Sequence, residues 1–66
     1  MTTAVQELGG VLQTAVIGKC VPETVYRAMR QGKFVSAQVV LRLAIALHPD
    51  EPEQQIARAT NLAGLG

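Results

Sequence analysis

The apolar residues of this 66-residue chain recur at helical spacing, and glycine and proline divide them into short segments. No segment alternates apolar and polar residues in the way that a half-buried strand does. The sequence therefore predicts an all-α fold of four to five short helices. The dividing residues are Gly9, Gly10, Gly18, Gly32 and the stretch from Pro49 to Pro52.

Capping and helix-breaking residues predict where each helix begins and ends. Threonine or serine caps a helix start, proline suits the first turn, and glycine tolerates the left-handed geometry of a helix end. The residue before a proline leaves helical geometry, so the fourth helix ends at His48. The predicted helices run from a cap at Thr2 or Thr3 to Gly9, over residues 11–18, over residues 22–31, from the cap Ser36 to about Leu47, and from Asp50 or Glu51 with Pro52 toward a fraying tail at 64–66.

A chain of this length supplies one small core, so we expect a single domain over residues 1–66. Such a domain buries only roughly 60% of the surface that its unfolded chain exposes, and oligomerisation is a common way to add stability. The single cysteine, Cys20, closes no internal disulfide, and with His48 it cannot fill a four-ligand zinc site. We therefore expect a reduced environment and no metal.

No secretory signal or membrane span is recognisable in the chain. Glu7 lies where a secretory signal would carry a positive charge, and no apolar run approaches the roughly 20 residues of a membrane helix. We expect a soluble, cytoplasmic protein with no membrane partner.

The net charge of +1 conceals a separation of charge along the chain. Residues 19–42 hold five of the six basic residues and a single acid, Glu23, whereas the rest of the chain is acidic. Such asymmetry indicates a polyanionic partner on one side of the molecule. An ordinary solvated charge pattern is the alternative reading.

The predicted helix over residues 22–31 has a core side and a polar side. At 100° per residue, one face carries Pro22, Val25, Ala28 and Met29, with Tyr26 at its boundary. A short helix that displays arginine on its other face is suited to the major groove, because arginine bonds guanine O6 and N7. A surface helix with solvated arginines has the same pattern. The polar face carries Glu23, Thr24, Arg27, Arg30 and Gln31.

A set of residues in VPETVYRAMRQGKFVSAQVVLRLAIAL matches a known pattern, namely Thr24, Val25, Arg27, Gly32, Ser36, Arg42, Leu43, Ala44, Ala46 and Leu47. On these residues the chain resembles the lambda-repressor-like and Cro-type helix-turn-helix DNA-binding family. The resemblance covers residues 5–47 and leaves 50–66 as a C-terminal helix and tail that could serve dimerisation.

The resemblance implies that a few side chains read bases and that others hold phosphates. It also implies a dimer on a pseudo-palindromic operator of double-stranded DNA, because one recognition helix reads few base pairs. The residues implied at base edges are Glu23, Thr24, Tyr26 and Arg27. Those implied near phosphates are Gln13, Lys19, Arg30, Gln31 and Lys33.

Three positions depart from the family pattern. The glycine of the family's turn falls on Lys19, and Gly18 comes one place early, so we expect a shifted or widened turn. The helix-2 glutamine of the family falls on Val11, which leaves Gln13 as the nearest polar residue. Cys20 stands where the family has valine or isoleucine, which indicates a buried small hydrophobe.

The fourth and fifth helices indicate a second apolar surface. Val40, Leu43, Ala44 and Leu47 form one stripe on the fourth helix, and Val39, Leu41 and Ile45 lie outside it. We predict a dimer interface that contains Leu41, Ile45, Ile56 and Leu62, with the alternative that the fifth helix completes the core of the monomer.

The chain lacks the parts of an enzyme. His48 has no nearby nucleophile and is better explained as a donor near helix carbonyls, and Asp50, Glu51 and Glu53 are explained by the start of a helix. We expect no enzymatic activity, no cofactor and no small-molecule ligand. The resemblance implies a small Cro-type repressor of phage, prophage or plasmid origin. The alternative is a protein-interaction module, such as an antitoxin or antirepressor, that acts through the fourth and fifth helices.

Overall fold

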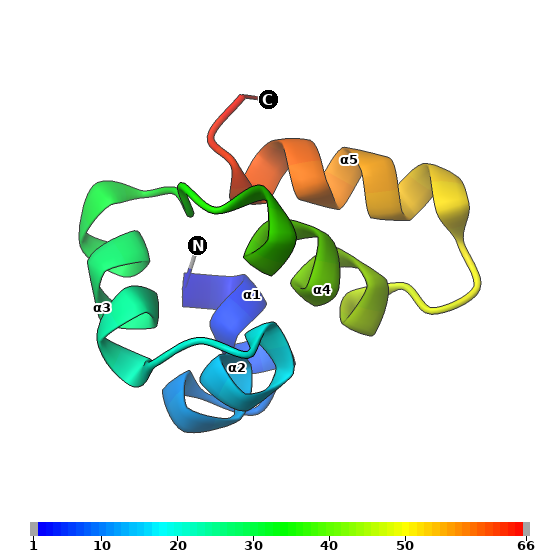
Figure 1. Cartoon of the computed structure of the whole chain (residues 1–66). Coiled ribbons are helices and arrows are strands. Elements are labelled where there is room, and N and C mark those ends of the chain that lie inside the picture. Colours follow the sequence, from blue (N-terminus) through cyan, green and yellow to red (C-terminus); the bar gives the residue numbers. More distant parts are fainter. Residues whose placement is uncertain (1, 66) are drawn as a thin grey trace.

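The computed structural model describes residues 2–65 and contains five helices and no strand in that range (Figure 1). Met1 and Gly66, the ends of the predicted domain, lie outside this range. The prediction of an all-α fold is confirmed. In chain order the helices are α1 (Thr2–Glu7), α2 (Val11–Gly18), α3 (Pro22–Gln31), α4 (Ala37–Leu47) and α5 (Pro52–Leu62).

The helices α2 to α5 lie within the limits that the sequence predicts. The Ser36 side chain accepts a hydrogen bond from the Val39 N–H at 3.4 Å and so caps α4, as expected. Pro22 and Pro52 occupy the first turns of α3 and α5.

The first helix is shorter than predicted. It begins at Thr2 and ends at Glu7, so Thr2 and Thr3, the two predicted caps, both lie inside the helix. Gly9 and Gly10 both have positive φ values, 99° and 102°, which no continuing α-helix accommodates. The chain therefore turns at the glycine pair and enters α2 directly.

The helix α5 also ends in a way that the sequence did not indicate. Gly64 takes a φ of 76°, and the Leu65 N–H donates to the Thr60 carbonyl at 3.0 Å. The described part of the tail is therefore a hydrogen-bonded turn, where fraying was predicted.

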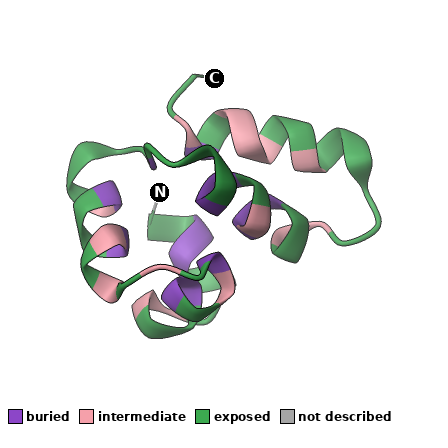
Figure 2. Cartoon of the chain, viewed as in Figure 1, coloured by how far each residue is buried: buried purple, intermediate pink, exposed green. Residues whose placement is uncertain are grey.

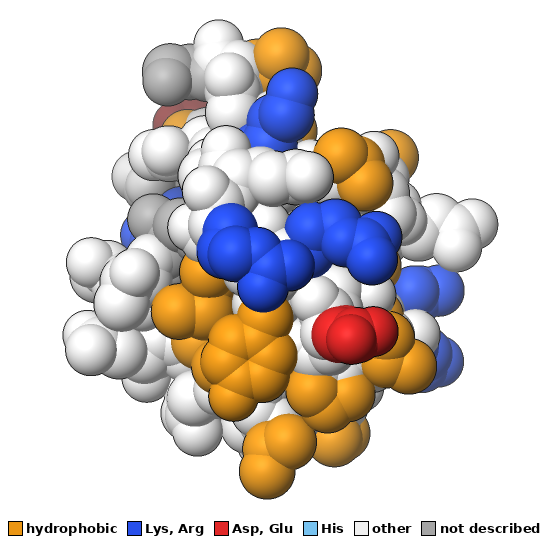
Figure 3. All heavy atoms as spheres, turned by 90° about the vertical axis from the view of Figure 1, so that its left-hand side faces the viewer, with side chains coloured by type: hydrophobic (Ala, Val, Ile, Leu, Met, Phe, Trp, Pro, Cys, Tyr) orange, Lys and Arg blue, Asp and Glu red, His pale blue; other side chains and the backbone are white. Residues whose placement is uncertain are grey.

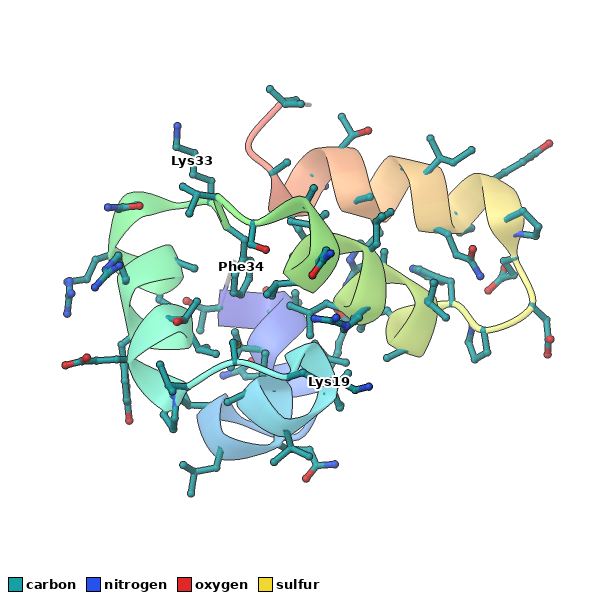
Figure 4. All side chains as sticks on the ribbon, in the orientation of Figure 1. Lys19, Lys33 and Phe34 are labelled. Carbon is teal, nitrogen blue, oxygen red and sulfur yellow. The ribbon has the colours of Figure 1, made fainter. Side chains whose placement is uncertain are left out.

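The core forms where all five helices meet, and buried residues lie on the sides that face the centre of the molecule (Figure 2). Phe34, in the loop between α3 and α4, points into this centre (Figure 4). Its N–H donates to the Leu62 carbonyl at 2.8 Å, which ties the loop to the end of α5. The larger core side chains are Val5, Leu8, Val25, Phe34, Val39, Val40, Leu43 and Leu62.

Two residues that were assigned outside the core belong to it. Leu62 is only 3% exposed, so its assignment to a dimer interface is wrong, because α5 packs beside α4 and closes the core of the monomer. Val39 is also buried, against the α2 helix, although it was placed outside the apolar stripe of α4. Leu41, Ile45 and Ile56 are exposed.

Two kinds of feature are absent from the described residues. No helix between residues 2 and 65 has the length and apolar character needed to cross a membrane. In the same range, no three His, Cys, Asp or Glu side chains gather in a way that would hold a metal ion.

Candidate nucleic-acid interface

The connection between α2 and α3 is a tight turn built on Lys19. This residue has φ 55° and ψ 45°, the left-handed conformation that glycine adopts most readily. The Lys19 and Cys20 N–H groups donate to the Val16 and Ala15 carbonyls at 3.2 and 3.0 Å, which closes the end of α2. The expectation of a shifted or widened turn is wrong, because Lys19 itself adopts the left-handed geometry.

Gly18 has a different role from the one that its place beside the turn suggested. A β-carbon at this position would lie 3.1 Å from the Val39 Cγ1 atom and 3.5 Å from the Leu43 Cδ2 atom. The glycine therefore permits a close approach of α2 to α4. This close approach fixes the position of α2, and of α3 directly after it, relative to α4.

Arg42 holds the same junction from the α4 side. Its Nη1 atom donates to the Gly18 carbonyl at 3.0 Å and satisfies a carbonyl at the end of α2. Arg42 is half-buried, so it contributes little to the exposed positive surface. Beside it, burial raises the pKa of the half-buried Cys20 thiol, and the Arg42 guanidinium offsets part of that rise.

The helix α3 has the two faces that its residue spacing predicts. Val25 and Ala28 are buried, and Met29 and Pro22 are half-buried on the same side. Thr24 is half-buried as well, at the edge of the polar face. The exposed residues of the helix are Glu23, Tyr26, Arg27, Arg30 and Gln31.

Lys and Arg side chains gather on the face of the molecule that α3 presents (Figure 3). Arg27, Arg30 and Lys33 are exposed, and the ion pairs between residues 2 and 65 lie elsewhere, at His48–Glu51 and Arg58–Glu7. Their charges are therefore available to an anionic partner. We call these three residues the basic cluster.

Part of the charge pattern on α3 also has a local explanation. Glu23 lies in the first turn and Arg30 in the last turn. Both placements complement the helix dipole and stabilise the helix by about 0.3–1 kcal/mol each. Arg27 lies in the middle of the exposed face, four residues after Glu23, a spacing at which the two opposite charges stabilise the helix weakly.

The predicted phosphate contacts do not all lie together. Lys33 points outward beyond the C-terminal end of α3, whereas Lys19 lies at the α2–α3 turn and points away from α3 (Figure 4). The β-carbon that Gly64 lacks would lie 3.0 Å from the Lys33 Cβ atom, so the tail after α5 packs against the stem of Lys33. Gln13 is exposed on α2. Of the two lysines, Lys33 therefore lies at the C-terminal end of α3, and Lys19 does not.

Four hydrophobic side chains on α2, on α3 and in the connection between them are exposed, and the sequence analysis did not predict them as a group. Leu12 and Val16 are each 71% exposed, Val21 is 61% exposed and Tyr26 is 51% exposed. Leu12 and Val16 are four residues apart and therefore share one face of α2, which was the available signal. We call these four residues the apolar patch.

A second apolar surface lies between α4, α5 and the tail. It is a groove of about 320 Å³ whose lining includes the exposed residues Val35, Leu41 and Leu65. Ile45 lies one turn beyond Leu41 on α4 and is also exposed.

Comparison with protein-family models, with curated proteins and with solved structures finds no match to this chain.

Proposed function

We propose that this protein is a sequence-specific regulator that binds double-stranded DNA with α3 in the major groove. The observation that carries the proposal is the exposed basic cluster, in which Arg27 and Arg30 lie on a short helix that follows a tight turn and Lys33 lies just beyond its end. A helix fits the width of the major groove, and arginine is the most frequent side chain to bond guanine there. The proposal assigns the chain no catalytic, metal or cofactor chemistry.

The side chains of α3 have separate roles in this proposal. Arg27 lies in the middle of the exposed face and bonds a guanine, and Glu23 accepts a hydrogen bond from the amino group of a cytosine. Thr24 and Tyr26 flank them. Arg30 and Gln31 in the last turn of α3 and Lys33 beyond it hold phosphates, as does Gln13 on α2, and these contacts fix the register of the helix on the duplex.

We further propose that the protein acts as a homodimer on a pseudo-palindromic operator, as small repressors of the Cro type do. One recognition helix contacts too few base pairs for specificity, and a two-fold dimer doubles the number. Leu41, Ile45 and Ile56 are exposed on α4 and α5 and are available for a contact between copies.

A gel-shift experiment with the DNA that flanks the protein's own coding region tests the proposal. The full chain is expected to bind a specific fragment, and Lys33→Gln is expected to weaken that binding. Lys19→Gln is the matched control, because it removes the same charge at a position that points away from α3. The absence of a specific complex, or an equal loss in both variants, would contradict the assigned face.

The groove between α4 and α5 favours a second candidate function, a protein-interaction module such as an antitoxin or antirepressor. Its exposed apolar lining is suited to a partner protein. Salt dependence separates the candidates. If Arg30 and Lys33 of two subunits neutralise phosphates, the logarithm of DNA affinity falls against the logarithm of salt concentration with a slope of roughly −4. A partner held in the apolar groove would show almost no salt dependence.

A further inference from the structure

The apolar patch of Leu12, Val16, Val21 and Tyr26 is a feature that phosphate binding and arginine readout do not use. Each of these side chains is more than half exposed. None contributes to the core, whose buried members lie elsewhere on α2 and α3. The patch therefore has no evident role in the folding of the monomer.

The patch and the basic cluster meet on α3, which carries Tyr26 of the patch and Arg27 and Arg30 of the cluster. Figure 3, which looks at the side of the molecule where α3 lies, shows hydrophobic side chains below the Lys and Arg side chains and continuous with them down to the lower edge. An acidic side chain lies beside the boundary (Figure 3). A ligand that covers the basic cluster therefore also comes close to hydrophobic side chains.

Double-stranded DNA offers one apolar group in its major groove that suits such a surface. The C5-methyl group of thymine projects there, and aliphatic and aromatic side chains contact it, whereas phosphates and the other base edges are polar. Apolar side chains would gain no binding free energy by facing a phosphate group or water. On the basis of the proposed DNA-binding function, we propose that Val21 and Tyr26 contact thymine methyl groups and that the preferred site carries thymines beside the guanine read by Arg27.

The positions of Val21, directly before α3, and of Tyr26, within α3, support this assignment. Val21 is the N-cap residue of α3, with the extended backbone angles φ −83° and ψ 153°. Recognition helices contact base edges chiefly through their N-terminal residues. Tyr26 lies just over one turn further along, next to Arg27 in the sequence and at the edge of the exposed face. Leu12 and Val16, on α2, extend the apolar surface away from α3.

Replacement of thymine by uracil tests the proposal, because uracil lacks the methyl group and keeps the same hydrogen-bonding edges. The full chain is first used to select its preferred site from random double-stranded DNA. Single thymines in that site are then replaced by uracil, and dissociation constants are measured at fixed salt. We expect affinity to fall by about three- to fourfold for each contacted methyl group that is removed.

Two variants assign the effect to the patch. Val21→Ala removes apolar contact at an exposed position, so its fold should persist, which a thermal melt verifies. In this variant the ratio of thymine to uracil affinity at the contacted position should approach one. Gln54→Ala shortens an exposed side chain on α5 that has no role in the proposed contacts, and it should keep the ratio of the native chain.

Three results would overturn the inference, and the two that concern the methyl contacts are distinguishable from the one that concerns the proposed function. Specific binding that is unaffected by uracil at every position, or a ratio that Val21→Ala leaves unchanged, would remove the methyl contacts and leave the proposed function intact. Failure to bind any double-stranded DNA in the selection would remove the proposed function itself, before uracil is introduced.

Discussion

Lys19 adopts an unfavourable backbone conformation at the junction between α2 and α3. Left-handed geometry costs a residue with a β-carbon roughly 1 kcal/mol, and glycine adopts it freely. The neighbouring glycine, Gly18, meets a different requirement from the one at position 19. Gly18 allows α2 to approach Val39, and Lys19 makes the turn.

We predict that Lys19→Gly stabilises the protein, because glycine removes the backbone strain at φ 55°. The free energy of unfolding should rise by up to about 1 kcal/mol. Lys19→Val should lower it by at least about 1 kcal/mol, since a β-branched side chain is the least tolerant of this geometry. Urea unfolding of the three proteins measures both changes. A more stable valine variant would show that the turn is relaxed.

A second prediction at the residue scale concerns sequence readout. Arg27→Ala should weaken binding to the selected DNA site by about 1–3 kcal/mol and relax the preference at one base pair in each half-site. Binding measurements on the site and on its single-base variants test this. An equal loss of binding free energy on the selected site and on random DNA would indicate that Arg27 contacts a phosphate and not a base.

At the scale of elements, the helices were predictable where their signals are local, and the contacts between them were not. Ser36, Pro22 and Pro52 act within their own helices, so their roles could be read from the sequence. The bond from Arg42 to Gly18 joins residues 24 apart, and no local pattern distinguishes it from a solvated arginine. The exposed face of α3 was predicted because helical spacing alone decides it. The apolar patch was missed because its residues come from two helices.

The bond between α4 and α2 leads to a prediction about stability. Arg42→Met keeps most of the side-chain volume and leaves the Gly18 carbonyl without its charged donor. The free energy of unfolding should fall by about 1–3 kcal/mol. Gln38→Met places the same side chain at an exposed position of α4 and should change stability by no more than about 0.5 kcal/mol. Equal stability of the two variants would show that water replaces the arginine at no cost.

At the scale of the whole molecule, α5 serves the monomer first. Leu62 is buried and accepts the Phe34 N–H, so the end of α5 also supports the loop that carries Lys33. The burial of Leu62 could not be predicted, because Ile56 and Leu62 are both apolar residues of the same helix. Only the packing of α5 on α4 buries Leu62 and leaves Ile56 exposed. The molecule measures 29 × 21 × 19 Å, with α3 at one end and the turn between α4 and α5 at the other (Figure 1). Any contact between copies through α4 and α5 would therefore leave the α3 face free.

We predict that two substitutions on α5 separate folding from association. Leu62→Ala should lower the free energy of unfolding by about 2–5 kcal/mol, because it opens a cavity in the core. Ile56→Ala, at an exposed site, should leave the monomer folded and weaken a dimer, so that the melting temperature depends less on protein concentration. Sedimentation and thermal melts at several concentrations measure both. A native chain whose melting temperature is independent of concentration would contradict a dimer that forms before DNA binds.

The most direct test of the central claim, that the α3 face reads double-stranded DNA, is a comparison of two affinities. The full chain is titrated, at a fixed and physiological salt concentration, with its selected DNA site and with a scrambled duplex of the same length and composition. The account predicts that the selected site contains two symmetric half-sites about 10 base pairs apart and binds at least about 10³-fold more tightly. Equal affinity for the two duplexes, or no measurable binding to either, would contradict it.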